Sequence, residues 1–165
     1  MDFDHRDPSK KSFTISRAML KSRQALLTEV AKCDVVCANC HRLRTVALFR
    51  EGALRPPAFQ ARSASSDPAR ERLRRKFRDV WGRDVEFLSA LRDRPCADCG
   101  GRFVSAAMEF DHRDPTTKAK LVTRMAGHVG RARLAQEIAK CDIVCANCHR
   151  SRTHLRRSVA ARRLL

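Results

Sequence analysis

The sequence predicts an α+β fold built from two short strand–strand–helix units, the first incomplete and the second preceded by helices. Three observations support this: an internal repeat, cysteine pairs at metal-binding spacing and an apolar periodicity typical of a helix near the middle of the chain. With 165 residues, one Trp and no Tyr, the chain is not expected to form one large core. Small units of this kind usually need a metal or disulfides for stability.

The internal repeat consists of two blocks separated by a variable segment. The recurring blocks are residues 1–8, which return as residues 108–115, and residues 29–42, which return as residues 137–150. Only conservative Val/Ile exchanges separate the two versions of the second block. The spacing between blocks differs by one residue, so the two copies are expected to share their elements and differ in the connecting loop.

The two copies differ in what precedes them. Cys96–Cys99 comes before the second copy, whereas the first copy begins at Met1, the equivalent of Met108. Either the first copy is truncated or translation starts upstream of Met1. Pro and Ser gather between the copies, as is typical of a linker. The predicted organisation is a half-repeat, a linker and a complete domain with leading helices and a basic C-terminal helix, at residues 1–48, 49–68 and 69–165.

The segment before the second copy has the pattern of helices. Asp67 or Ser66 is suited to cap a helix whose first turn holds Pro68. The apolar residues then fall on one face at helical spacing, and these are Leu73, Phe77, Val80 and Trp81. Gly82 is expected to interrupt this helix, and Asp84 to cap a second short helix ending near residue 91.

Two Cys-x-x-Cys pairs predict a structural metal site in the second copy. The four residues are Cys96, Cys99, Cys145 and Cys148. Two such pairs supply the four tetrahedral thiolates that structural Zn²⁺ prefers, and Gly100 lets the chain turn after the first pair. A redox pair or disulfides are the alternatives. Cys141 is expected to be a core residue rather than a fifth ligand.

The first copy contains only one cysteine pair, Cys37 and Cys40. Half a tetrahedron holds structural zinc poorly, so Cys33 or another chain would have to contribute the remaining ligands. The first copy is therefore expected to be less stable than the second.

Residues 109–112 alternate apolar and polar side chains, which predicts a strand that Pro115 ends. Asp111 and His112 are neighbours, and neighbours on an ideal strand point to opposite faces. A bulge or a strand end would be needed for both to serve one site. His149 follows Cys148 directly, at the start of an expected helix, so zinc would hold the strand of His112 against the helix of His149.

The net charge of +17, from 35 basic and 18 acidic side chains, favours a nucleic-acid partner, although a merely soluble surface would have the same charge. Met1 is followed by acidic residues rather than an apolar signal segment, and no apolar run is long enough for a membrane helix. A cytoplasmic protein with no membrane partner is expected, and the sequence leaves its oligomeric state open.

The order Cys-x-x-Cys, Asp-His, Cys-x-x-Cys-His resembles the HNH endonuclease family, in particular its zinc-stapled members with a ββα-metal core. The resemblance covers residues 96–153 and, for the truncated copy, residues 1–45. It implies a metal-dependent endonuclease that hydrolyses DNA phosphodiester bonds. A zinc-stapled nucleic-acid-binding module without catalysis is the alternative.

The resemblance also implies roles for individual residues. His112 would be the general base, while Asp111 and His149 would hold a catalytic divalent cation, most simply Mg²⁺. The central Asn of the family is absent at its usual position, which is Lys140 here; Asn147 would replace it or would cap the helix. The first copy keeps the equivalent residue types, and little activity is expected there because its clamp is half missing: Asp4, His5, Cys37, Cys40 and His41.

Overall fold

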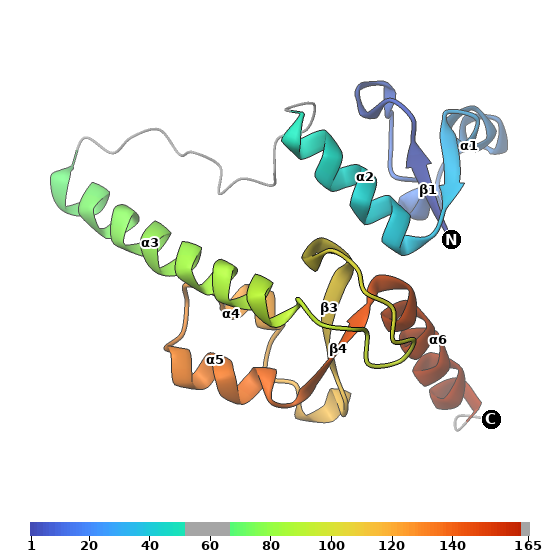
Figure 1. Ribbon diagram of the computed structural model, residues 1–165. Coiled ribbons are helices and arrows are strands. Elements are labelled where there is room, and N and C mark those ends of the chain that lie inside the picture. Colours follow the sequence, from blue (N-terminus) through green and yellow to red (C-terminus); the bar gives the residue numbers. More distant parts are fainter. Residues whose placement is uncertain (52–66, 163–165) are drawn as a thin grey trace. The chain divides into compact units, whose positions relative to one another are not determined.

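The computed structural model describes residues 1–51 and 67–162, with side chains described through Ser158 (Figure 1). Its internal contacts divide the chain into unit 1, Met1–Pro56, and unit 2, Pro57–Leu165. The boundary falls inside the predicted linker at residues 49–68, of which residues 52–66 lie outside the described part.

Unit 1 contains one strand pair and two α-helices. Its elements in chain order are β1 (Asp2–His5), η1 (Pro8–Lys10), η2 (Ile15–Arg17), α1 (Arg23–Val30), β2 (Cys33–Val36) and α2 (Ala38–Arg50). After a long helix and an additional 3-10 helix, unit 2 repeats this order, with the α-helix α4 (Val122–Met125) in place of η2. Its elements are α3 (Pro68–Leu91), η3 (Ser105–Ala107), β3 (Met108–His112), η4 (Pro115–Thr117), α4 (Val122–Met125), α5 (Arg131–Ile138), β4 (Cys141–Cys145) and α6 (Ala146–Arg162).

Each unit therefore has one small antiparallel sheet of two strands. Asp2 pairs with Val36 in unit 1, and Met108 pairs with Cys145 in unit 2. Both hairpins continue residue for residue to their other ends, without the extra residue that a bulge would insert. The predicted mixed fold with two strand pairs and a cysteine cluster is confirmed at this level.

The strand pair of unit 2 has helices on both faces. Figure 1 shows α6 on one side of β3 and β4, and α4 and α5 on the other. Because strand side chains alternate, Met108, Phe110 and His112 share one face, and Glu109 and Asp111 share the other. The face with Met108, Phe110 and His112 packs against the core of unit 2, whereas the face with Glu109 and Asp111 is turned towards α6. This alternation decides which predicted site residues meet.

The core of unit 2 has two parts, joined by Phe110. One part packs α3 against α4 and α5 through Leu88, Val122, Met125, Ala126 and Leu134. The other surrounds the cysteines through Cys96, Met108, Ile143, Val144 and Cys145. Unit 1 buries much less: among its described apolar residues only Val36 and Ala38 are buried.

The predicted helix start at Asp67 is confirmed, since its side chain accepts a hydrogen bond from Ala69 N. The predicted interruption at Gly82 is wrong, because α3 runs through it to Leu91. Asp84 caps no second helix there. Its carboxylate is buried and accepts a hydrogen bond from Gly127 N at 2.9 Å, while Arg131 Nη2 lies 3.0 Å away. The packing of α3 against α4 and α5 outweighs the modest free-energy cost of placing one glycine inside a helix.

Among the described residues, no helix combines the length and apolar character needed to cross a bilayer.

Candidate functional site

The four cysteines predicted to bind metal converge in unit 2. The potential ligand atoms of Cys96, Cys99, Cys145 and Cys148 all lie within 4.8 Å of one another. Within the described ranges this is the one such group of three or more His, Cys, Asp or Glu side chains. Thiolates bound at about 2.3 Å to a tetrahedral zinc ion are separated by roughly 3.8 Å, so the donor set and its spacing fit Zn²⁺.

The local chain positions these thiols. Cys96 and Cys99 lie on a tight turn, closed by a hydrogen bond from Gly100 N to Cys96 O at 2.9 Å and completed by Gly100 with a φ of +69°. Ala97 N donates to Ile143 O at 3.0 Å, which attaches this turn to β4. Cys145 ends β4 immediately before α6 begins. The cluster thus ties a loop, a strand and a helix together.

Backbone hydrogen bonds favour a thiolate at Cys96. Cys145 N donates to Cys96 Sγ at 3.1 Å, and Cys148 N donates to Cys145 Sγ at 3.5 Å. Burial raises the pKa of Cys96, but backbone hydrogen bonds from Cys99 and Cys145 outweigh it and lower that pKa to about 6. Burial and the neighbouring thiols raise the pKa of Cys148. Before a cation binds, we therefore expect one thiolate beside protonated thiols, and a bound cation would compensate the charge of further thiolates.

Cys141 lies outside this cluster. Its Sγ donates to Glu137 O at 3.5 Å, and it packs against the core between α3 and α5. Burial raises its pKa to about 11.

A second group combines His149 with two carboxylates. His149 lies in the first turn of α6, where its Nδ1 contacts Glu109 Oε2 and its Nε2 lies 3.3 Å from Asp111 Oδ1. Glu109 and Asp111 are two residues apart on β3, so both carboxylates face α6. About one third of the His149 side chain is exposed (35%), whereas Asp111 is buried. The imidazole therefore bridges two carboxylates at the edge of the unit.

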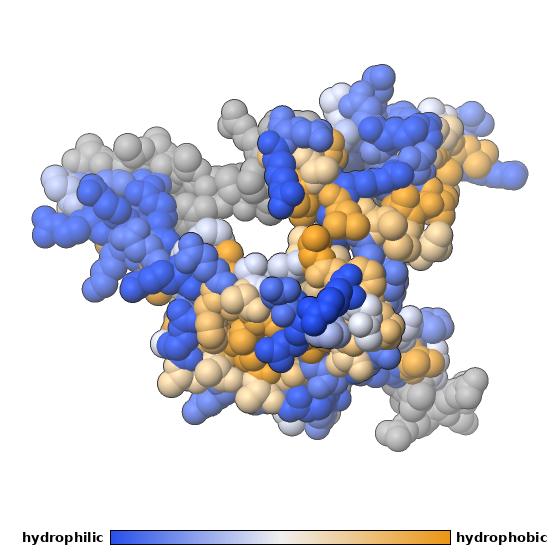
Figure 2. All heavy atoms as spheres, in the orientation of Figure 1, coloured by the Kyte–Doolittle hydropathy of each residue, from blue (hydrophilic) through white to orange (hydrophobic). Residues whose placement is uncertain are grey.

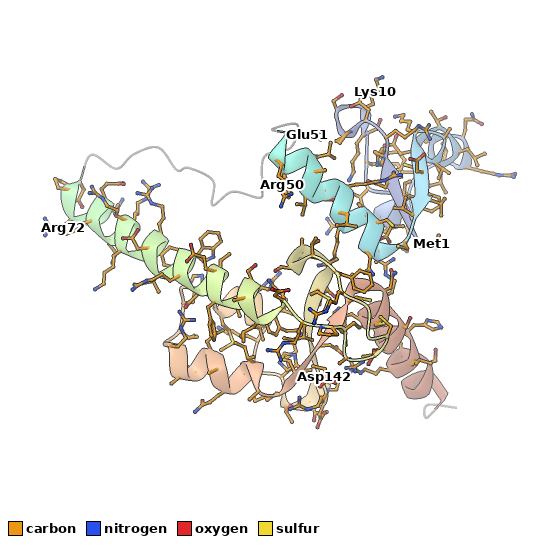
Figure 3. The ribbon with its side chains drawn as sticks, in the orientation of Figure 1. Met1, Lys10, Arg50, Glu51, Arg72 and Asp142 are labelled. Carbon is orange, nitrogen blue, oxygen red and sulfur yellow. The ribbon has the colours of Figure 1, made fainter. Side chains whose placement is uncertain are left out.

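Two arginines of α6 bind the same carboxylate. Arg156 donates from Nη1 and Nη2 to the two oxygens of Asp111, each at 2.8 Å. Arg152 donates from Nη1 to Asp111 at 3.0 Å and to Asp142 at 2.9 Å; Asp142 is labelled in Figure 3. Arg152 also reaches Asp98 in the first cysteine turn, and Asp98 is the main cause of its raised pKa. These bonds fasten α6 to the strand pair and to the cysteine cluster.

His112 does not join this group. Its Nε2 lies 2.8 Å from Glu137 Oε1, and only 5% of its side chain is exposed. Glu137, on α5, also accepts from Lys140 Nζ at 2.7 Å and from Ala119 N at 2.8 Å. The hydrogen bond from Lys140 is the largest cause that lowers the pKa of Glu137 to about 2. The regular β3–β4 pairing explains the separation, because adjacent residues of an unbulged strand point to opposite faces.

Asn147 is the second residue of α6, inside its first turn. The position before the helix is held by Cys145, whose Sγ accepts from Cys148 N. Lys140, at the family's usual Asn position, supports Glu137 instead and also donates to Thr117 O at 2.9 Å.

Unit 1 repeats both arrangements. His41 Nδ1 lies 3.2 Å from Asp2 Oδ2, and its Nε2 lies 3.4 Å from Asp4 Oδ1. His5 Nε2 lies 2.8 Å from Glu29 Oε1, as His112 does from Glu137. The cysteine pair Cys37 and Cys40 begins α2, and no equivalent of Cys96–Cys99 exists within residues 1–51.

Sequence reasoning missed Glu109, Glu137 and the two arginines as partners. Glu109 precedes Asp111 by two positions on an expected strand, which is the signal for a shared face. Glu137 recurs as Glu29 in the repeat, but nothing in the local pattern connects it to His112 across 25 residues. From the sequence, Arg152 and Arg156 are typical of a solvent-exposed basic helix. Only the fold shows that both donate hydrogen bonds to Asp111.

Comparison with protein-family models, with curated proteins and with solved structures finds no match to this chain.

Proposed function

We propose that unit 2 is an HNH-type endonuclease that uses a divalent cation to hydrolyse DNA phosphodiester bonds. The observation that supports this most is the position of His149 beside Glu109 and Asp111, in a hairpin–helix unit fastened by four cysteines. Rigid support of this kind is what metal-assisted catalysis requires, because reacting groups must be held close to the productive geometry.

The charge of the chain supports a polyanionic substrate. The excess of 17 positive charges is spread widely, and α3 carries a run of exposed basic side chains: Arg70, Arg72, Arg75 and Lys76. Figure 2 shows the first turns of α3 covered by hydrophilic residues, and Arg72 is labelled there in Figure 3. Basic side chains of this kind bind phosphates without reading sequence. We therefore expect DNA binding that weakens steeply with salt.

The donor set beside α6 suits a hard divalent cation such as Mg²⁺ or Mn²⁺. Adjacent ligands of a six-coordinate cation at about 2.1 Å are roughly 3 Å apart, and Asp111 Oδ1 and His149 Nε2 are 3.3 Å apart. Asp111 and His149 would hold the cation through Oδ1 and Nε2, while Glu109, which contacts the other ring nitrogen Nδ1, would orient the imidazole. When bound there, it would neutralise charge that develops on the scissile phosphate. Arg156, with both its terminal nitrogens on Asp111, would compete with it.

The role of His112 as general base needs a rearrangement. Its imidazole is buried and held by Glu137, on the strand face opposite His149. A base must reach the attacking water directly or through one water molecule. His112 would have to leave Glu137 to do so, and the proposal for the cation residues does not depend on this step.

The alternative is a zinc-stapled module that binds nucleic acid without cutting it. The ion pairs of Asp111 with Arg152 and Arg156 favour this reading, because they already compensate the buried carboxylate. The burial of His112 against Glu137 favours it as well.

A plasmid assay separates the two functions. Supercoiled DNA is incubated with zinc-loaded protein and Mg²⁺ or Mn²⁺, using wild type, His149→Ala, Asp111→Asn and the control His154→Ala, an exposed histidine of the same helix. The endonuclease proposal expects metal-dependent nicking by wild type and control, with at least roughly a hundredfold loss in the other two. Gel retardation with no cleavage under either metal would support the binding module.

A further inference from the structure

Cys37 and Cys40 of unit 1 have the local geometry of half a thiolate metal site. Cys37 caps α2, and its Sγ accepts a hydrogen bond from Cys40 N at 3.4 Å. The equivalent bond in the complete cluster, from Cys148 N to Cys145 Sγ, measures 3.5 Å. Cys40 is exposed and Cys37 is partly buried. Two thiols are thus presented side by side at the start of a helix.

The remaining cysteines of the chain do not complete this site. Of the eight cysteines, four form the cluster of unit 2 and Cys141 is bonded to Glu137 O. Cys33 begins β2 and bonds Glu29 O at 3.4 Å, at the opposite end of the strand from Cys37. Four residues of strand span roughly 13 Å, which is far beyond a shared coordination sphere. The His41 ring is engaged by Asp2 and Asp4. Within residues 1–51, none of these side chains completes the site.

The surface around Cys37 and Cys40 is exposed, whereas the equivalent surface of unit 2 is covered. Phe3 is 45% exposed and Val35 is 58% exposed, whereas Ile143, the counterpart of Val35, is 8% exposed. In unit 2 the turn of Cys96–Cys99 covers this edge of the strand pair, with Ala97 N bonded to Ile143 O. An apolar margin of this kind favours burial against another protein surface.

We propose that Cys37 and Cys40 bind a second zinc ion shared with the same two cysteines of a second copy of the chain. Each copy would supply half of the four thiolates, in a contact where the same surface meets itself. A second copy offers what the site lacks: two adjacent thiols beside an apolar edge. A zinc ion with four thiolates carries net negative charge, which suits the N-termini of two helices in strongly basic chains.

Zinc content and molar mass of the full chain test this together. Purified protein is kept in reductant and about 0.3 M salt, which screens the repulsion between basic chains, and measured by elemental analysis and light scattering. The expected result is a dimer with about three zinc ions per two chains. Cys37→Ser combined with Cys40→Ser should give a monomer with about one zinc ion per chain. Cys33→Ser, a matched change outside the site, should behave as wild type.

The double serine variant could lose the dimer because it fails to fold. Cys40→His is the control for this, because it changes the same position but keeps a zinc ligand. It should keep the dimer while shifting the visible absorption bands of the Co²⁺-substituted protein. The proposal is overturned if the wild type is a monomer, or if a dimer contains only about one zinc ion per chain. A dimer that persists in the double serine variant, or the loss of the dimer in Cys40→His, overturns it as well.

Discussion

Nε2 of His112 lies 2.8 Å from Oε1 of Glu137, on the face of β3 opposite the carboxylates that contact His149. This contact buries an imidazole and a carboxylate together, with Lys140 and two loop amides completing the carboxylate's hydrogen bonds. It fastens α5 and the loop after β3 to the strand pair. Its counterpart, His5 with Glu29, has the same place in unit 1.

His112→Ala should therefore destabilise unit 2 as well as affect any cleavage. Removing the imidazole leaves a buried oxygen of Glu137 short of a partner and opens a cavity, at a cost of about 1–3 kcal/mol. Urea unfolding of the zinc-loaded protein measures this, with the exposed His154→Ala as control. Unchanged stability of His112→Ala would contradict a structural role for the pair.

Glu137 predicts a specific acid dependence of stability. Because its folded-state pKa lies near 2, below its ordinary 4.5, the ionised carboxylate stabilises the fold above pH 4.5, and this contribution is lost as the pH falls towards 2. Glu137→Gln should thus be clearly less stable than wild type at pH 7. Paired denaturant titrations of the zinc-loaded proteins at pH 7 check this, because protonation of the cysteine ligands releases zinc at the acid pH at which Glu137 itself titrates. Equal stability of the two proteins at pH 7 would refute it.

Removal of zinc should unfold unit 2. The four cysteines tie the turn at Cys96–Cys99 to the end of β4 and the start of α6. Structural zinc contributes about 10 kcal/mol or more to the folding of domains of this size. We expect chelator, or Cys96→Ser, to abolish the cooperative thermal transition seen by circular dichroism. Cys141→Ser, outside the cluster, should cost only about 1 kcal/mol. A cooperative transition surviving in Cys96→Ser would argue against a metal-dependent fold.

Arg156→Ala should strengthen binding of Mn²⁺ beside α6 if Asp111 is a cation ligand. The guanidinium bonds both carboxylate oxygens, and its loss frees Oδ1, while Oδ2 keeps its bond from Arg152 Nη1. A competing charged hydrogen bond of about 1.5 kcal/mol corresponds to roughly tenfold in affinity. Calorimetric titration of zinc-loaded protein measures the change. Arg157→Ala, an exposed neighbour, is the control. Equal affinity in both variants would remove Asp111 from the proposed cation site.

Local signals in the sequence predicted much of this protein. The cysteine spacing identified the four clustered thiols, the alternation of residues 109–112 identified β3, and Asp67 with Pro68 identified the start of α3. Each of these depends on chemistry or periodicity within a few residues. The repeat likewise predicted the strand pair and following helix in both copies, and these recur, whereas the variable middle forms a 3-10 helix (η2) in unit 1 and an α-helix (α4) in unit 2.

Only the tertiary structure decided which chemical groups meet. Gly82 remains helical because α3 packs against the rest of unit 2 on both sides of it, through Phe77 at His128 and Leu88 in the core. Asp84 turns inward on the same side and accepts a hydrogen bond from Gly127 N. The regular pairing of β3 with β4 sends Asp111 towards α6 and His112 towards Glu137 on α5. Sequence spacing fixes which strand residues share a face, but the partner on each face comes from distant segments. Those partners depend on how the helices pack, which no local pattern contains.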